Sequence, residues 1–232
     1  NWDYRYCWMR DAYYTLTAFN NIGHFEELER YFNYIVNVSV KAEDRFQPLY
    51  GITGETQLDE NILNLAGYKN NQPVRVGNQA YTHIQNDVYG QVLVSLLPLY
   101  TDKRFINVER SDSLKIIMDL LGKIDELMEE PDAGLWEFRN FAQHHSYTYL
   151  FHWAGASAAK KIGQVFDNKE ITELAEKLIQ SSSEKIEACF AAERGVYTQA
   201  IGTKTLDASD LQLIVMNYLD KDSDVAKRHL EA

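Results

Sequence analysis

The chain has 232 residues, a formal net charge of −11 and a hydrophobic fraction of 45%. The acidic balance argues against proteins that bind nucleic acid or anionic membranes, and the hydrophobic fraction excludes a disordered chain. No apolar run approaches the roughly 20 residues that cross a bilayer. Together with the acidic charge, this leads us to expect neither a nucleic-acid nor a membrane partner.

Apolar residues at helical spacing predict an all-α fold. The segments with this spacing are 11–19, 25–42, 84–99, 112–129, 145–162, 168–190, 208–219 and 223–231. They pair into about four helical hairpins. No repeat and no linker divides them, so we expect a single domain over residues 1–232.

The connections between these helices differ in length. Residues 44–82 have no sustained period but keep aromatic and β-branched residues, which predicts a long, ordered and functional loop. Pro131-Asp132-Ala133-Gly134 predicts a turn, and Asn168 predicts a helix cap. Small residues within 145–162 permit close helix packing, and residues 193–197 predict a loop or a short hairpin.

The first eleven residues combine two Trp, two Tyr and an Arg-Asp pair. Aromatic faces stack on the apolar face of a pyranose, while Arg and carboxylate groups bind its hydroxyls. The strip therefore indicates a sugar-binding surface. On its own, Asp11 is equally explained as an acidic residue at a helix N-terminus, where the helix dipole favours it.

Glu137 follows Trp136 in the second long loop. Burial against an indole raises the pKa of a carboxyl group, as the general acid of a glycosidase requires. The alternative is a surface Glu beside a packing Trp. Gln85-Asn86-Asp87 is either part of a site or a helix cap.

Other reactive side chains have structural interpretations. His144, His145 and His152 do not match a zinc pattern and are read as loop or core residues, so no metal site is expected. Cys7 is read as a buried small residue, and a disulfide with Cys189 is possible. Two cysteines also allow a reducing compartment, which leaves the location unknown with a slight preference for the cytoplasm.

Several blocks occur together and in order along the chain. They are Asn1-Trp2-Asp3-Tyr4-Arg5-Tyr6-Cys7-Trp8-Met9-Arg10-Asp11-Ala12, Gly67-Tyr68, Pro73-Val74-Arg75-Val76-Gly77-Asn78, Gln85-Asn86-Asp87-Val88-Tyr89-Gly90, Pro131-Asp132-Ala133-Gly134-Leu135-Trp136-Glu137-Phe138-Arg139, Glu193-Arg194-Gly195 and Leu206-Asp207-Ala208-Ser209. As a set they resemble glycoside hydrolase family 15, the group of glucoamylases, glucodextranases and bacterial trehalase-like enzymes.

The resemblance implies a partial (α/α)6 barrel and an inverting reaction that uses two carboxyl groups and water, without a cofactor. It implies that Glu137 is the general acid. The substrate-binding residues implied in the same way are Arg10, Asp11, Trp8, Tyr4, Leu135, Trp136, Asp87 and Tyr81. The catalytic base is a Glu in a later segment of the family, which we expect beyond Ala232, because Glu231 lies on a polar helix end. We thus expect a domain truncated at both ends, and inactive by itself.

The function implied is that of a glucoamylase, which releases β-glucose from the non-reducing ends of α-glucans. A trehalase of the same family is the first alternative, since only the acceptor-side sugar differs. A non-catalytic sugar-binding helical fragment and an unrelated helical scaffold are the others. The expected partner is an α-glucan or α-glucoside, and the oligomeric state is not readable.

Overall fold

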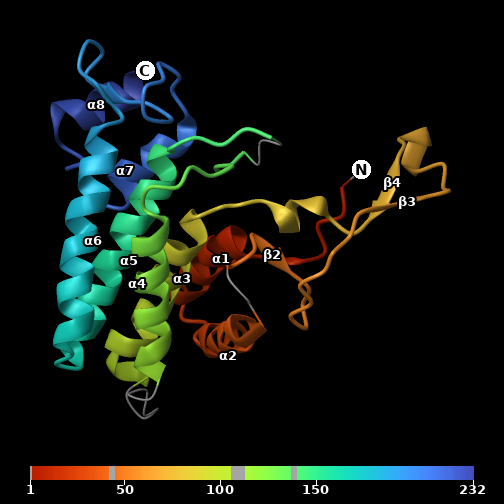
Figure 1. Cartoon of the computed structure of the whole chain (residues 1–232), viewed down its shortest axis with the longest axis horizontal. Coiled ribbons are helices and arrows are strands. Elements are labelled where there is room, and N and C mark those ends of the chain that lie inside the picture. Colours follow the sequence, from red (N-terminus) through yellow and green to blue (C-terminus); the bar gives the residue numbers. More distant parts are fainter. Residues whose placement is uncertain (1, 42–44, 106–112, 137–139) are drawn as a thin grey trace. The chain divides into compact units, whose positions relative to one another are not determined.

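The computed structural model describes residues 2–41, 45–105, 113–136 and 140–232. The chain divides into two compact units, residues 1–84 and residues 85–232. Helices dominate the second unit, whereas the first combines two helices with short strands (Figure 1). That both units belong to one catalytic domain stays a prediction.

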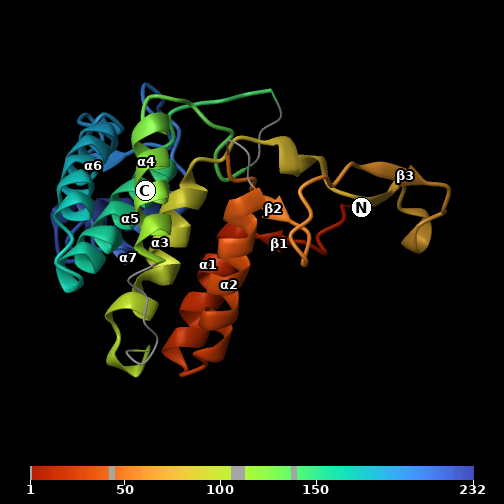
Figure 2. The ribbon, with the colours of Figure 1, turned by 60° about the horizontal axis from the view of Figure 1, so that its bottom comes forward.

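Two helices form the helical part of the first unit. They are α1 (Met9–Asn21) and α2 (Glu26–Lys41), which lie side by side in Figure 2. Met9, Tyr13 and Leu16 recur every three to four residues along α1 and are buried, as one face of a packed helix requires. The predicted helices over 11–19 and 25–42 are confirmed with slightly shifted ends.

The long loop of the first unit is ordered, as predicted, and contains two antiparallel strand pairs. β1 (Cys7–Trp8) pairs with β2 (Leu49–Tyr50), and β3 (Asn61–Leu63) pairs with β4 (Val74–Val76). Two single 3-10 turns, η1 (Tyr68–Asn70) and η2 (Gln79–Thr82), complete it. Leu49, Leu58 and Ala80 form a buried cluster beneath η2 and the first strand pair.

Four long helices build the second unit. They are α3 (Asp87–Thr101), α4 (Leu114–Leu127), α5 (Ser146–Val165) and α6 (Lys169–Glu187). A short 3-10 turn, η3 (Lys103–Phe105), follows α3. The neighbouring helices α5 and α6 run side by side over their whole length (Figures 1 and 2).

Glycines bring α3 and α5 into backbone contact. A Cβ on Gly90 would lie 1.9 Å from the carbonyl oxygen of Phe151, and one on Gly155 would lie 2.6 Å from the Cα of Gly90. The prediction that small residues of α5 allow close packing is confirmed. The Asn168 cap is confirmed as well, since its side chain accepts a hydrogen bond from the backbone N–H of Ile171 at 3.0 Å.

The end of the chain agrees with the predicted elements only in part. The hairpin of β5 (Phe190–Ala191) and β6 (Val196–Tyr197) confirms the loop or hairpin predicted there. The helix predicted over 208–219 is wrong: a 3-10 turn, η5 (Ala208–Leu211), leads into the single-turn α7 (Gln212–Val215). Asn217, at φ +59°, reverses the chain and ends it. The last helix is α8 (Asp224–Glu231).

The histidines and cysteines for which no catalytic role is expected lie as follows. His145 and His152 are buried, and the ring Nδ1 of His144 lies 2.6 Å from the hydroxyl of Tyr149. Cys7 and Cys189 are free thiols, the first half-buried and the second buried. Among the described helices, none is long and apolar enough to span a bilayer.

Candidate active site

The N-terminal strip runs from an extended segment through β1 into α1. Trp8 lies opposite Leu49 in the strand pair and packs on the buried cluster beneath it. Tyr4 is 64% exposed, and its ring centroid lies 5.9 Å from that of Trp8. The first unit therefore presents an exposed tyrosine next to a half-buried tryptophan, which suits contact with a sugar face.

Arg10 and Asp11 occupy the first turn of α1. Arg10 is buried and Asp11 is exposed. Consecutive residues of a helix point about 100° apart, so these two side chains leave the helix in different directions. Asp11 also fits the helix-dipole interpretation, because it lies at the N-terminus.

Tyr81 lies in η2 and packs on the same buried cluster as Trp8. Its hydroxyl donates a 2.7 Å hydrogen bond to Oδ1 of Asp59, and this bond lowers the pKa of the Asp59 carboxyl group. The structure thus brings Tyr81 to the same part of the first unit as Tyr4 and Trp8, which are more than 70 residues away in sequence. Their role in binding stays a prediction.

The buried carboxyl group of Asp132 accepts hydrogen bonds from three segments of the second unit. Asp132 is 1% exposed. Its Oδ2 accepts hydrogen bonds from the backbone N–H of Asn86 at 2.8 Å and from the hydroxyl of Thr148 at 2.9 Å, while Oδ1 accepts from the N–H of Gly134 at 3.2 Å. Asp132 therefore ties the start of α3 and the first turn of α5 to the turn that contains Leu135 and Trp136.

Asp87, the first residue of α3, is fully buried. Its Oδ2 accepts a 2.8 Å hydrogen bond from Gln91, whose amide also lies 3.3 Å from the hydroxyl of Tyr147. Asn86, the N-cap residue of α3, makes no side-chain cap hydrogen bond. Its backbone N–H donates to Asp132, and its side-chain amide lies 3.5 Å from the carbonyl oxygen of Glu130.

Protonation in this region is controlled by burial. Burial first, and the charge of Asp87 second, raise the pKa of Asp132 to about 7. The ring Nε2 of His145 lies 4.0 Å from Oδ1 of Asp132, and burial lowers the pKa of His145. At neutral pH a carboxyl group that is about half protonated thus faces an imidazole whose charged form is disfavoured by burial.

Two further aspartates lie beside the predicted turn. The exposed Trp136 donates a 2.5 Å hydrogen bond from its indole N–H to Oδ2 of Asp207. Asp210, in the η5 turn that Asp207 caps, is buried and accepts a hydrogen bond from the hydroxyl of Ser146. Neither Asp132 nor Asp210 is predicted as a site residue from the sequence, although Asp132 stands in the Pro131-Asp132-Ala133-Gly134 block.

The predicted general acid cannot be placed in this geometry. Glu137 lies outside the described residues, and its role stays a prediction. Leu135 and Trp136 precede it in the turn held by Asp132, and Leu135 is half-buried. Among the described residues, no group of three or more His, Cys, Asp or Glu side chains is arranged to hold a metal ion.

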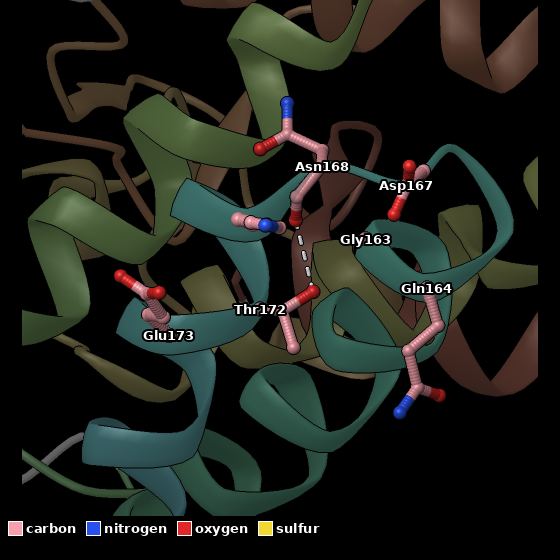
Figure 3. Close-up of a pocket in the computed structure, with 7 residues that line it drawn as sticks. Gly163, Gln164, Asp167, Asn168, Thr172 and Glu173 are labelled. Carbon is pink, nitrogen blue, oxygen red and sulfur yellow. Dashed lines mark hydrogen bonds between the residues drawn. The ribbon is translucent and has the colours of Figure 1, made fainter.

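A shallow cavity of about 290 Å³ lies at the turn between α5 and α6 (Figure 3). It is lined by Gly163, Asp167, Asn168 and Thr172 among others, and the Asn168 carbonyl accepts a 2.9 Å hydrogen bond from the Thr172 hydroxyl. These polar groups cap the start of α6. The cavity contains none of the predicted site residues.

Comparison with known proteins covers nearly the whole chain. Residues 1–231 match the model of Glycosyl hydrolases family 15. A trehalase of Mycolicibacterium smegmatis is 31% identical over 96% of this chain and 33% of its own length. A trehalase of Thermoplasma volcanium is 28% identical over 94% of this chain and 35% of its own length. The chain spans about a third of the length of these curated relatives.

Solved structures share the fold. A bacterial glucoamylase complexed with acarbose superposes with a TM-score of 0.68 at 18% identity, over 97% of this chain and 32% of that one. A glycosidase variant in complex with glucose gives 0.63 at 15% identity, over 96% and 58%. The predicted all-α fold, a partial (α/α)6 toroid, is confirmed.

Proposed function

The chain belongs to glycosyl hydrolase family 15, and we propose that the protein carrying it hydrolyses the α-glucosidic bond of trehalose. This proposal rests on one observation: trehalases align with most of this chain at 26–31% identity. From the sequence alone, glucoamylase activity was expected, and trehalase activity was the first alternative. The glucoamylase structure, at 18% identity, supports the fold alone.

In the proposed reaction Glu137 gives its proton to the glycosidic oxygen while that oxygen separates from the anomeric carbon. Water attacks the same carbon from the opposite face and loses a proton to a second carboxylate, so the configuration inverts. Trehalose then yields one β-glucose and one α-glucose. The second carboxylate is not assigned in residues 1–232.

The described residues support a division of roles. In the first unit, Tyr4, Trp8 and Tyr81 offer aromatic surface to a glucose ring, and Arg10 and Asp11 supply groups that bind hydroxyls. In the second unit, Asp87 helps to keep Asp132 protonated, and Asp132 holds the turn of Leu135 and Trp136. These assignments are ours: those in the first unit follow the family pattern, whereas those of Asp87 and Asp132 rest on the contacts of the second unit.

Substrate choice tests the proposal directly. The full-length protein is assayed against trehalose, maltose, isomaltose and soluble starch, and we expect the highest kcat/KM for trehalose. Preference for maltose or starch would restore the glucoamylase interpretation. Absence of hydrolysis with retained glucose binding would favour a non-catalytic sugar-binding protein.

A second experiment tests the acid. Glu137→Gln removes the proton donor, and general acid catalysis contributes about 10²–10⁴-fold, so turnover of trehalose falls by that factor while glucose binding persists. Glu126→Gln, an exposed residue beside Lys123, is the control and retains turnover. NMR of the first products shows equal amounts of α- and β-glucose for inversion, whereas two α-glucose molecules would contradict it.

A further inference from the structure

Asp3 is a buried carboxylate in the middle of the N-terminal strip. It is 5% exposed. Arg5 donates to both of its oxygens at 2.8 Å, the hydroxyl of Tyr6 donates to Oδ2 at 3.1 Å, and the backbone N–H of Gly77 donates to Oδ2 at 3.3 Å. These bonds, led by the one from Arg5, hold the pKa of Asp3 well below its usual range.

The contacts of Asp3 join two segments that are more than 70 residues apart. Its backbone carbonyl accepts a 2.9 Å hydrogen bond from the side chain of Asn78. Asn78 in turn accepts from the N–H of Ala80 at 3.1 Å and donates its own N–H to the carbonyl of Leu58 at 2.9 Å. Tyr81 follows Ala80 directly. One short path of hydrogen bonds therefore runs from Asp3 to the η2 turn.

The same carboxylate also fixes the strip itself. Tyr4 stands between Asp3 and Arg5, and the bidentate bond between those two side chains closes a ring around its backbone. Tyr4 is mostly exposed, so few packing contacts hold it otherwise. The hydrogen bonds of Asp3 thus restrain the backbone that carries the Tyr4 ring, which lies beside the ring of Trp8.

We infer that Asp3 is a positioning residue, which holds Tyr4 and its neighbour Trp8 in place relative to Tyr81 and so shapes the glucose-binding surface. This inference rests on the proposed function. Asp3 is enclosed by its partners and does not itself touch sugar. Its effect is on the affinity for glucose, through Tyr4 and Trp8.

The chain contains a matched control. Asp102 forms the same local pattern with the residue two positions later: Arg104 donates its Nε to Oδ2 at 2.8 Å and its backbone N–H to Oδ1 at 2.9 Å. Both residues lie in the second unit, at the end of α3, and none of the hydrogen bonds described for Asp102 reaches another segment. A change at Asp102 therefore removes an equivalent Asp-Arg pair without the link that Asp3 makes.

The test compares Asp3→Asn and Asp102→Asn in the full-length protein, with glucose as the probe and tryptophan fluorescence as the readout. We expect the dissociation constant for glucose to rise about tenfold in Asp3→Asn and to stay unchanged in Asp102→Asn. Hydrogen exchange at the amides of Gly77 and Ala80 becomes faster only in Asp3→Asn. Asn78→Ala removes both side-chain bonds of Asn78 but leaves the bonds of the Asp3 carboxylate to Arg5, Tyr6 and Gly77. It serves if Asp3→Asn fails to fold, and it shows the same two changes at smaller size.

The outcomes separate the two claims. If folded Asp3→Asn binds glucose as the wild type does, Asp3 is merely structural and the inference is overturned, while trehalose hydrolysis by the wild type still supports the proposed function. If the wild type neither binds glucose nor hydrolyses trehalose, the proposed function and this inference both fail. In that case the exchange rates at Gly77 still report the link between the segments.

Discussion

Asp210 provides a sharp test of how burial controls charge in the second unit. It is 2% exposed. Oδ1 accepts a hydrogen bond from the hydroxyl of Ser146, whereas Oδ2 is buried and has no hydrogen-bond partner among the described residues. Burial first, and the charge of Asp207 as a smaller cause, raise the pKa of Asp210 to about 7. Ionisation of Asp210 therefore costs free energy in the folded protein.

The sign and the size of this cost follow from proton linkage. The folded protein binds the proton of Asp210 more tightly than the unfolded chain, in which the pKa is near 3.8. The contribution of Asp210 to the free energy of unfolding therefore falls as the pH rises from about 4 through 7, and its full cost is present above pH 7. At about 1.4 kcal/mol per pKa unit, the loss between pH 5 and pH 8 is about 2–3 kcal/mol. Asp132 adds a loss of the same sign and similar size.

Denaturant unfolding of the protein at pH 5 and pH 8 measures the effect. Asp210→Asn keeps an oxygen for Ser146 and cannot ionise, so it reduces the difference between the two pH values by about 2–3 kcal/mol. Any cost of the new amide group is equal at both pH values and cancels. Asp119→Asn, an exposed residue paired with Lys115, leaves the difference unchanged. A full wild-type difference in Asp210→Asn would refute the reasoning.

The helices of this chain could be predicted because they carry their own signal. In α4 and α6 the buried apolar residues recur every three to four positions over many turns. The end of α7 has no such signal. Asn217 adopts a left-handed conformation, and the N–H of Leu219 returns to the carbonyl of Leu213 at 2.9 Å, with no glycine or proline to announce the break. Strands of two or three residues are likewise too short to show alternation.

The candidate site also contains residues that the sequence predicts and residues that it does not. The aromatic strip was predicted because side-chain type alone indicates sugar binding, and resemblance added Glu137. Resemblance also pointed to Asp87, but the roles of Asp3, Asp132 and Asp210 were not predicted, because their burial depends on contacts between distant segments. Asp132 binds a backbone group 46 residues away, and Asp3 contacts a side chain 75 residues away. Local sequence shows a carboxylate at each position but not what encloses it.

The remaining predictions concern single contacts. Tyr81→Phe removes the hydroxyl that donates at 2.7 Å to the exposed carboxylate of Asp59, and we expect a small decrease in the free energy of unfolding on denaturation; an unchanged value would show that the bond is unimportant. Gly90→Ala places a Cβ 1.9 Å from a carbonyl oxygen of α5, so α3 and α5 must separate. Denaturant unfolding should show a loss of about 3 kcal/mol or more, because overpacking moves two backbones. Gly122→Ala is the matched change within α4, where the added Cβ meets nothing within 4 Å, and it should stabilise the protein by up to about 1 kcal/mol through helix propensity. Since both changes add one methyl group to a helical glycine, only the contact between α3 and α5 can give them opposite signs, and equal effects would show that this contact is absent.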